Sequence, residues 1–219
     1  MLKVSDIVRD IVFSSEPELT VLSRGLLNFS AYAKRIHGDV ERRARKPVQL
    51  GTIVVALSRI SGEILDEDPL LPQIVLDGIT VKSNLAEITF SKTSANRLRA
   101  QKLVTENEFA QADFMTITYG ASELAIFAPM SLVQPVLRNF KPDAPKLLLE
   151  RLAALTVQFS NVYIETPNMY FALMRAIAVK KLNIVELIST FTELTFLVRQ
   201  TDLNELFQLL NSLMRLPEP

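Results

Sequence analysis

The stretch LNIVELISTFTELTFLVRQTD, residues 182–202, contains two short apolar runs that predict two neighbouring β-strands. The runs are NIVELI and LTFLV, both rich in β-branched and aromatic residues, and the polar link STFTE between them suits a tight connection. Residues 167–181, before the stretch, repeat apolar side chains at helical spacing. After it, Asp202 and Glu205 have the spacing of a capping box at the start of another helix. With a first strand at residues 152–160, the predicted order is strand, helix, strand, strand, helix.

A second copy of this pattern lies upstream. Glu123-Leu124 matches Glu193-Leu194 at a distance of 70 residues, and Phe90-Ser91 matches Phe159-Ser160 at a distance of 69. Two copies of one strand-helix-strand-strand-helix unit are a more specific signal than either copy alone.

The repeated unit resembles the ACT domain, and in particular the tandem regulatory ACT pair at the C-terminus of aspartate kinases. The resemblance is carried by Pro167-Asn168, by the LNI of residues 182–184, and by IST followed by TEL within residues 188–194. The family pattern there is Pro-Gly at the helix start, then I-N-I after the helix, then I-S-T-S-E-I. The likeness extends from about residue 74 to the end of the sequence.

The fold expected from this resemblance is α+β. A small all-helical N-terminal domain, residues 1–65, would precede two tandem ferredoxin-like ACT units at residues 73–140 and 147–216. The acidic, proline-rich segment at residues 66–72 (DEDPLLP) is the expected boundary, and residues 141–145, with two prolines, are the expected link between the units.

Four helices are predicted for the N-terminal domain from apolar residues on one helical face. The first starts near Val4 with Ser5 as its cap, and the second has Pro17 in its first turn and ends near Gly25. The other two cover residues 30–45 and 47–60, with Ser61-Gly62 expected to end the fourth.

Some details of the C-terminal two-thirds are open to more than one interpretation. Asp77-Gly78 and Ser83-Asn84 are turn signals inside the alternating run 73–90, so a hairpin or an additional strand is expected there. Pro135 lies inside the helix predicted at residues 129–140 and should shorten or kink it.

Composition excludes several classes of protein. Lys plus Arg equals Asp plus Glu, so net charge offers no argument for a nucleic-acid or anionic partner. Cysteine is absent, which fits a cytoplasmic location, and the N-terminal residues have acidic side chains and no signal-peptide cleavage pattern. The longest apolar runs are far shorter than the roughly 20 residues of a membrane span.

Catalytic motifs are not found. The glycines are isolated, at positions 25, 38, 51, 62, 78 and 120, so no glycine-rich loop can cradle phosphates, and we expect no kinase activity, cofactor or metal. His37 is the one histidine and has no companion ligand nearby in the sequence. The acidic groups Glu16/Glu18 and Asp66/Glu67/Asp68 are interpreted as a helix start and a solvated linker.

The resemblance to ACT domains implies a site for a small amino acid at an interface between units. Carried over, the loop after the first strand supplies backbone contacts, and the second strand and the following turn supply polar side chains. The candidate ligand-binding residues are Thr166, Asn168, Glu186, Thr192 and Glu193, with Ser122 and Glu123 at the matching turn of the first copy. Asn168 stands where the family has glycine.

The expected function is therefore regulatory. An amino-acid effector would shift the arrangement of ACT units, which would pair as a homodimer through their sheets and pass the change to a partner or to the helical domain. One alternative is a ligand-responsive DNA-binding regulator, based on the basic cluster 42–46 (RRARK) and a helix-turn-helix interpretation of the N-terminal domain. Another alternative is a protein-interaction module that has no effector.

Overall fold

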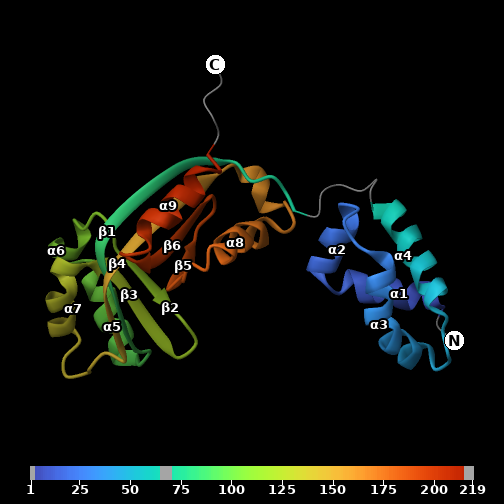
Figure 1. The fold of residues 1–219 in the computed structure, drawn as a ribbon. Coiled ribbons are helices and arrows are strands. Elements are labelled where there is room, and N and C mark those ends of the chain that lie inside the picture. The colour runs from blue at the N-terminus through green and yellow to red at the C-terminus, as the bar shows by residue number, and fades with distance from the viewer. Residues whose placement is uncertain (1–2, 65–70, 215–219) are drawn as a thin grey trace, which may run out of the picture. The chain divides into compact units, whose positions relative to one another are not determined.

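The computed structural model describes residues 3–64 and 71–214, without the side chains of residues 107 and 108. The chain divides into two compact units, residues 1–70 and 71–219, and each is described by itself (Figure 1). The predicted boundary at 66–72 and the acidic group Asp66/Glu67/Asp68 fall largely or wholly outside the described residues, as do residues 217–219.

The N-terminal unit is helical and is built around one apolar core. Its helices are α1 (Val4–Phe13), α2 (Glu16–Ser23), α3 (Phe29–Ala44) and α4 (Leu50–Ile64). Each turns buried apolar residues toward the others, among them Val8, Leu22, Ile36, Val40, Ile53 and Leu57. The apolar periodicity of the sequence thus marks the core, because the helices have no other means of removing these side chains from water.

Two predicted helix ends in this unit are wrong. Ser5 lies inside α1, where its hydroxyl donates to the Asp6 carboxylate over 3.2 Å, and the cap position belongs to Lys3. Gly62 does not end α4, which continues to the buried Ile64. Burial of Ile64 outweighs the weak helix propensity of a single glycine.

The C-terminal unit contains a series of strands and helices in the order β-α-β-β-α, and this series occurs twice. The elements of the first half are β1 (Leu76–Ser91), α5 (Ser94–Leu103), α6 (Asn107–Ala110), β2 (Thr116–Tyr119), β3 (Glu123–Pro129), the 3-10 helix η1 (Met130–Leu132) and α7 (Val133–Asn139). Those of the second half are β4 (Leu147–Phe159), η2 (Asn161–Ile164), α8 (Met169–Val179), β5 (Glu186–Ser189), β6 (Glu193–Arg199) and α9 (Leu203–Asn211). The predicted α+β class is confirmed.

The strands within residues 71–214 form one six-stranded antiparallel sheet in the order β2-β3-β1-β4-β6-β5. The two longest strands, β1 and β4, pair at its centre, with Leu85 opposite Leu152. The register shifts on either side of this pair, between Lys82 and Leu85 and between Leu85 and Glu87. The turn signal Ser83-Asn84 is therefore a bulge in one continuous strand rather than the turn of a hairpin.

The register makes the two halves equivalent. Leu85 and Leu152 are 67 residues apart, and the same shift relates Ser91 to Gln158. Their sheet partners Glu123 and Glu193 are 70 residues apart, because the second half has three more residues between its first and third strands. The predicted match of Glu123 with Glu193 is confirmed, because both residues begin the third strand of a half. The predicted match of Phe90 with Phe159 is wrong by two residues, since Phe90 is equivalent to Val157. A two-residue error keeps a side chain on the same face of a strand, which is why the pattern looked correct.

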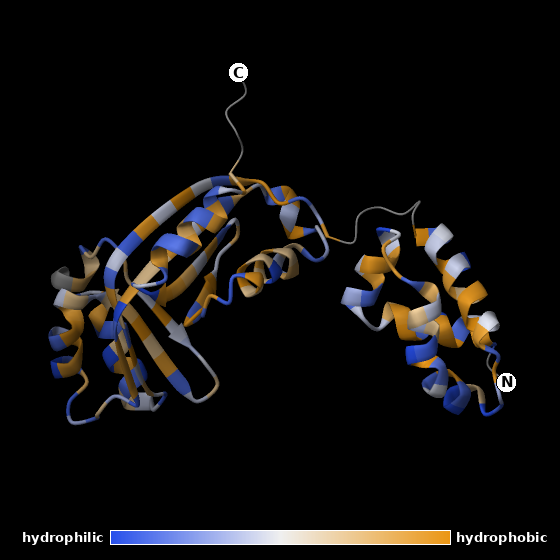
Figure 2. Cartoon of the chain, viewed as in Figure 1, coloured by the Kyte–Doolittle hydropathy of each residue, from blue (hydrophilic) through white to orange (hydrophobic). Residues whose placement is uncertain are grey.

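Helices cover one face of this sheet. Two apolar clusters lie there, one around Phe90 and Phe140, whose rings stack 4.1 Å apart, and the other around Phe196 with Leu173 and Leu206. A third cluster on the opposite face is made by strands and by the segments before β2 and β5: Leu85, Phe127, Leu152, Ala154 and Leu197, with Phe114, Val185 and Ile188. Figure 2 shows apolar bands separated by polar ones along β1.

Two expectations about the C-terminal helices need qualification. Pro135 lies in the first turn of α7, and η1 precedes this helix. Backbone N–H groups in the first turn have no acceptor within the helix, so the lack of an N–H in proline costs no helical hydrogen bond there. Asp202 occupies the cap position of α9 but makes no capping bond, and its carboxylate accepts from the Thr201 hydroxyl over 2.9 Å. None of the helices among the described residues is long and apolar enough to cross a membrane.

Candidate ligand-binding site

The turn between β5 and β6 places Thr192 and Glu193 beside the end of β4. The Phe159 amide donates to the Thr192 carbonyl over 3.0 Å, and the Thr190 amide donates to the Glu193 carbonyl over 2.9 Å. Glu193 lies opposite Gln158 in the sheet, one residue before β4 ends. The predicted turn residues therefore stand where the loop that leads to α8 begins.

That loop, residues 160–168, is held by its own hydrogen bonds. The Thr166 hydroxyl donates to the Val162 carbonyl over 2.9 Å, so this predicted ligand contact already stabilises the loop. The Tyr163 hydroxyl accepts from the Val75 amide at 3.0 Å and donates to the Gln73 carbonyl at 3.1 Å, which ties the loop to the residues before β1. The loop is thus a defined structure that presents Asn168 at its end.

Asn168 takes the left-handed conformation, with φ of 65°, immediately before α8. Its carbonyl accepts from the Ala172 amide over 2.9 Å and so begins the helix. Asn is one of the few residues that tolerate this conformation. The backbone at Asn168 accordingly has a conformation that glycine also favours, while its side chain occupies space that a glycine leaves open.

The matching turn in the first half is closed by lysines. The Lys92 amide donates to the Ser122 carbonyl over 2.9 Å, and the Lys92 ammonium donates to the Gly120 carbonyl. Glu123 forms an ion pair with Lys146, which precedes β4. Within residues 3–64 and 71–214, no Lys or Arg lies within ion-pair distance of Glu193. The two equivalent glutamates therefore differ in charge environment.

Glu186 is separated from the turn that it was predicted to join. It begins β5 opposite Leu197, whereas Glu193 is at the other end of the β5-β6 hairpin. Its carboxylate accepts from the Leu187 amide over 3.1 Å. Its negative charge instead raises the pKa of Glu87, a residue that sequence reasoning missed.

Glu87 is a buried carboxyl in β1, only 6% exposed, on the face of the sheet that the helices leave uncovered. Burial raises the pKa of Glu87 most, the hydrogen bond from the Thr89 hydroxyl (3.0 Å) lowers it, and the charges of Glu186 and Glu123 raise it further. The available signal was an acidic residue inside the otherwise apolar run LAEITF, residues 85–90. Ala154 occupies the equivalent position in the second half, next to a 2.7 Å hydrogen bond between Thr156 and Thr195.

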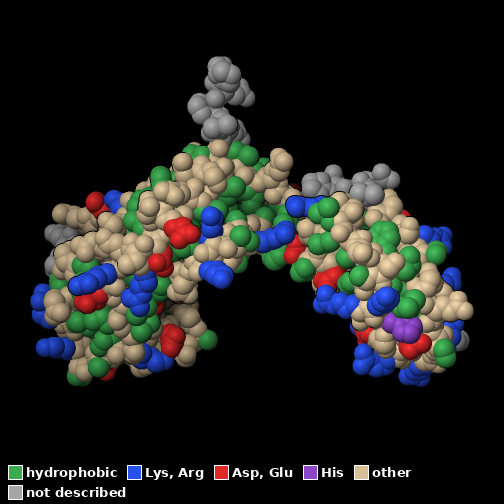
Figure 3. Space-filling model, in the orientation of Figure 1, with side chains coloured by type: hydrophobic (Ala, Val, Ile, Leu, Met, Phe, Trp, Pro, Cys, Tyr) green, Lys and Arg blue, Asp and Glu red, His purple; other side chains and the backbone are tan. Residues whose placement is uncertain are grey.

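Two of the four basic residues in the cluster at residues 42–46 form internal ion pairs. Arg42 contacts Asp39 at 2.7 Å, and Arg43 contacts Asp10 at 2.7 Å and Asp39 at 3.2 Å. On the face shown in Figure 3, Lys and Arg side chains are interspersed with acidic ones. These pairs account for much of the charge in the cluster without a nucleic-acid partner.

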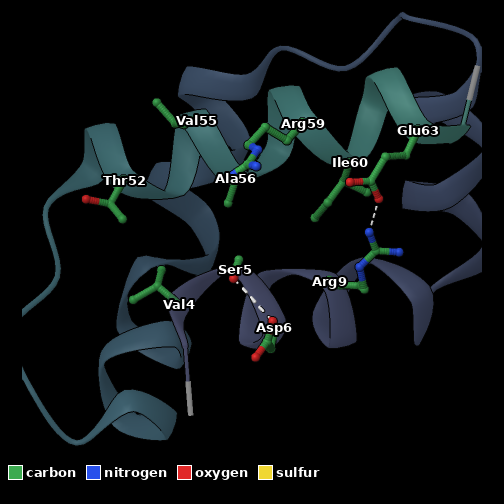
Figure 4. Close-up of a pocket in the computed structure, with 10 residues that line it drawn as sticks. All are labelled: Val4, Ser5, Asp6, Arg9, Thr52, Val55, Ala56, Arg59, Ile60 and Glu63. Atoms are coloured by element: carbon green, nitrogen blue, oxygen red, sulfur yellow. Dashed lines mark hydrogen bonds and ion pairs between the residues drawn. The ribbon is translucent and has the colours of Figure 1, made fainter. Parts of the chain in front are cut away.

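A groove of about 450 Å³ lies between α1 and α4 of the same unit (Figure 4). Its rim carries the ion pair between Arg9 and Glu63, and its lining mixes Asp6 and Arg59 with apolar residues such as Val55. This alternation of charges favours no single class of ligand.

The remaining titratable candidates have structural partners. His37 contacts the Val48 carbonyl through Nε2 at 2.6 Å, which links α3 to the segment before α4. Glu16 accepts from the Thr20 hydroxyl at 2.7 Å, and Glu18 lies 3.7 Å from Arg35. No cluster of three metal-ligating side chains occurs among the described residues.

Comparison with solved structures identifies the fold. No protein-family model and no curated protein sequence matches the chain. The ligand-free regulatory subunit of aspartate kinase from Thermus thermophilus is 11% identical, with a TM-score of 0.52 over 64% of this chain and 99% of that one. The aspartate kinases of Clostridium acetobutylicum and Synechocystis give TM-scores of 0.53 and 0.52 at 13% and 16% identity.

The matches differ in how much of each neighbour they cover. The chain covers only 37% of the Clostridium enzyme and 32% of the Synechocystis enzyme, although it covers almost the whole Thermus subunit. The resemblance to the ACT-type regulatory region of aspartate kinases is thus confirmed at the level of the fold.

Proposed function

We propose that this chain is a regulatory ACT-type protein that binds a small amino acid and has no kinase activity of its own. The shared fold with an aspartate kinase regulatory subunit supports the regulatory part. The amino-acid part rests on Glu193. This exposed carboxylate has no Lys or Arg partner among the described residues and lies beside the loop that ends in Asn168. A carboxylate in this setting suits a ligand ammonium group.

The sheet supports an assignment of two interlocked ferredoxin-like units, at residues 73–140 and 147–216. The C-terminal part of β1 pairs with β3, while its N-terminal part pairs with the C-terminal part of β4. Each half thereby gains a fourth strand from the other half. Rearrangement in one unit would be felt in the other through the shared β1-β4 pair.

Transmission would proceed by population shift. The amino acid would bind one arrangement of the units more tightly than another, and the change would reach the helical N-terminal unit or a separate partner. The edge strands β2 and β5 have open hydrogen-bonding sides, which favours a homodimer through the sheets. Because the proposed effector is a free amino acid, we also propose that the protein acts in the cytoplasm, where free amino acids are available.

Thermal unfolding in the presence of each of the twenty amino acids tests the ligand. An effector at 100 times its dissociation constant adds about 2.7 kcal/mol, or about 5 °C or more in midpoint for a unit of this size. Glu193→Gln should remove the shift, while Glu123→Gln, which alters the lysine-paired turn, should retain it. Absence of any shift at millimolar concentrations would remove the amino-acid part of the proposal.

A second candidate, a protein-interaction module without effector, is favoured by the outer side of α8. Phe171 and Val179 on this helix are 43% and 74% exposed, and Val162 just before it is 63% exposed. The equivalent helix α5 carries Arg97, Arg99 and Lys102 instead. Sedimentation of the wild type and of Phe171→Glu, without any amino acid present, distinguishes this candidate, because a module of this kind should assemble without ligand.

A further inference from the structure

A pocket of about 520 Å³ lies at the central bulge of β4, away from the turn that contains Glu193. It is lined by Glu150, Arg151, Arg199, Gln200 and Thr201. Arg199 ends β6 and Glu193 begins it, so the two locations are about 20 Å apart along the strand. The pocket is therefore separate from the candidate site described above.

Two arginines, Arg151 and Arg199, line this pocket. The Arg199 guanidinium donates to the Glu150 carbonyl over 3.3 Å, and the Gln200 amide donates to the Arg151 carbonyl over 3.0 Å. No Asp or Glu carboxylate among the described residues lies within 4 Å of either guanidinium. Arg99, by contrast, pairs with Asp143 at 2.7 Å. Neither arginine of the pocket is therefore in an ion pair within the part of the chain that the structure describes.

The local backbone does not require these charges. Arg151 is left-handed, with φ of 57°, and its equivalent in the first half, Asn84, has φ of 59°. Asn suits this conformation, whereas a side chain such as Arg disfavours it. The other equivalent positions hold Ser83, Pro129, Met130 and Ser131, none of which is charged. The same bulge thus occurs with and without arginine, so the arginines need a reason other than folding.

We propose that this pocket binds a small zwitterionic α-amino acid, with Arg151 and Arg199 on its carboxylate and Glu150 on its ammonium group. The planar guanidinium matches a carboxylate with two parallel hydrogen bonds. Glu150 supplies an exposed carboxylate in the same lining. The volume is in the range of sites for small molecules. The site stands independently of Glu193.

NMR of the full-length protein tests this assignment through the side-chain Nε–Hε signals of Arg151 and Arg199. Glycine, acetate, methylammonium and inorganic phosphate are titrated separately to about 50 mM. Glycine should shift both signals in a saturable manner with millimolar affinity, about fivefold or more tighter than acetate because acetate lacks the ammonium contact. The side-chain amide of Asn84, at the uncharged equivalent position, should not respond.

Variants test the carboxylate contact of the arginines and the ammonium contact of Glu150 separately. Arg151→Asn keeps the left-handed backbone, as Asn84 does, and together with Arg199→Gln it should weaken glycine about tenfold or more. Glu150→Gln should weaken glycine but not acetate. Glu193→Gln should leave all these titrations unchanged, so this proposal and the effector site near Glu193 succeed or fail separately. Unchanged backbone amide spectra confirm that each variant is folded.

Several outcomes overturn the proposal. Shifts that do not saturate, or that persist in the Arg151→Asn/Arg199→Gln variant, show nonspecific contact. Phosphate binding tighter than glycine identifies a phosphate site instead. Equal affinity for glycine and acetate, with no effect of Glu150→Gln, removes the ammonium contact and therefore the amino acid.

Discussion

The two halves of the C-terminal unit share one backbone plan but differ in their polar residues. In the first half, two residues join β1 to α5, and Thr93 caps that helix by accepting from the Asn96 amide over 3.1 Å. In the second half, residues 160–168 join β4 to α8 through a 3-10 turn and the left-handed Asn168.

Their charges differ as well. Glu123 is paired with Lys146. The residue that stands to Glu193 as Lys146 stands to Glu123 is Ile79 of β1, so Glu193 has no such lysine. Apolar burial and two bulges define the common sheet, whereas the loops and charges differ between its halves. Comparing equivalent positions thus separates what the fold requires from what a ligand or a partner requires.

The largest expected effect concerns the central pair Leu85 and Leu152, which are 2% and 0% exposed. Leu85→Ala and Leu152→Ala should each lower the free energy of unfolding by about 2–5 kcal/mol, because each leaves a cavity in the core that both halves share. Urea unfolding followed by circular dichroism measures the loss. Leu98→Ala, at a 56% exposed site, should change stability by about 0.5 kcal/mol or less.

A shared sheet also predicts that the two halves unfold together. Hydrogen exchange in either leucine variant should show equal loss of protection in β3 and β6. Selective loss in one half would show that the halves are independent folding units.

The buried carboxyl in the first half gives the next largest effect. Because the folded-state pKa of Glu87 lies above its ordinary value of 4.5, the folded protein holds the proton more tightly than the unfolded chain. Stability from this group is complete below pH 4.5 and is lost as pH rises through the raised pKa. Glu87→Gln should therefore be more stable than the wild type at pH 7, by on the order of 1 kcal/mol, and gain little at pH 4.

Denaturant titrations at pH 4 and pH 7 measure the difference between wild type and Glu87→Gln, which cancels the titration of other groups. Ala154→Gln provides the matched change in the second half and should add no pH dependence. An advantage of Glu87→Gln that is the same at both pH values would contradict the raised pKa.

The left-handed residues in the two bulges should respond in opposite directions. Arg151→Asn should stabilise the protein by about 0.5–1 kcal/mol and Asn84→Arg should destabilise it by a similar amount, since Asn tolerates this conformation better. Thermal unfolding of both variants provides the measurement. If both exchanges have the same sign, side-chain contacts rather than backbone conformation control these positions.

The smallest stability effect is expected at the ion pair of Glu123 and Lys146, whose side chains are about half exposed. Lys146→Met should change stability by about 0.5 kcal/mol or less because such pairs are solvated. It should, however, make the first turn resemble the second and so add a thermal shift with the amino acid that acts at Glu193. Lack of a new shift would show that the longer loop, and not the unpaired glutamate, creates the site.

Much of the fold was accessible from the sequence because strands and helices leave periodic apolar patterns. The repeated strand-helix-strand-strand-helix order, the helices of the N-terminal unit and the equivalence of Glu123 with Glu193 were all predicted. Local details were less accessible. Ser5, Gly62 and Asp202 have the right chemistry for helix ends, but burial and neighbouring side chains decided where the helices begin and end.

The candidate site was predicted only where its residues follow directly from the hairpin. Thr192 and Glu193 lie at the turn as expected, whereas the charge of Glu186 helps to raise the pKa of Glu87, which is 99 residues away in the sequence. No local pattern could pair these two carboxylates, since their proximity arises from the order of strands in the sheet.

The sequence by itself determined the elements, their order and their repetition, because those depend on the spacing of apolar side chains along a few turns or strands. Only the tertiary structure decided that the two repeats merge into one sheet through β1 and β4, which charges are paired, and that Glu87 is buried. The physical reason is that burial and ion pairing depend on contacts between residues far apart in the chain, and the long-range register of the sheet sets those contacts.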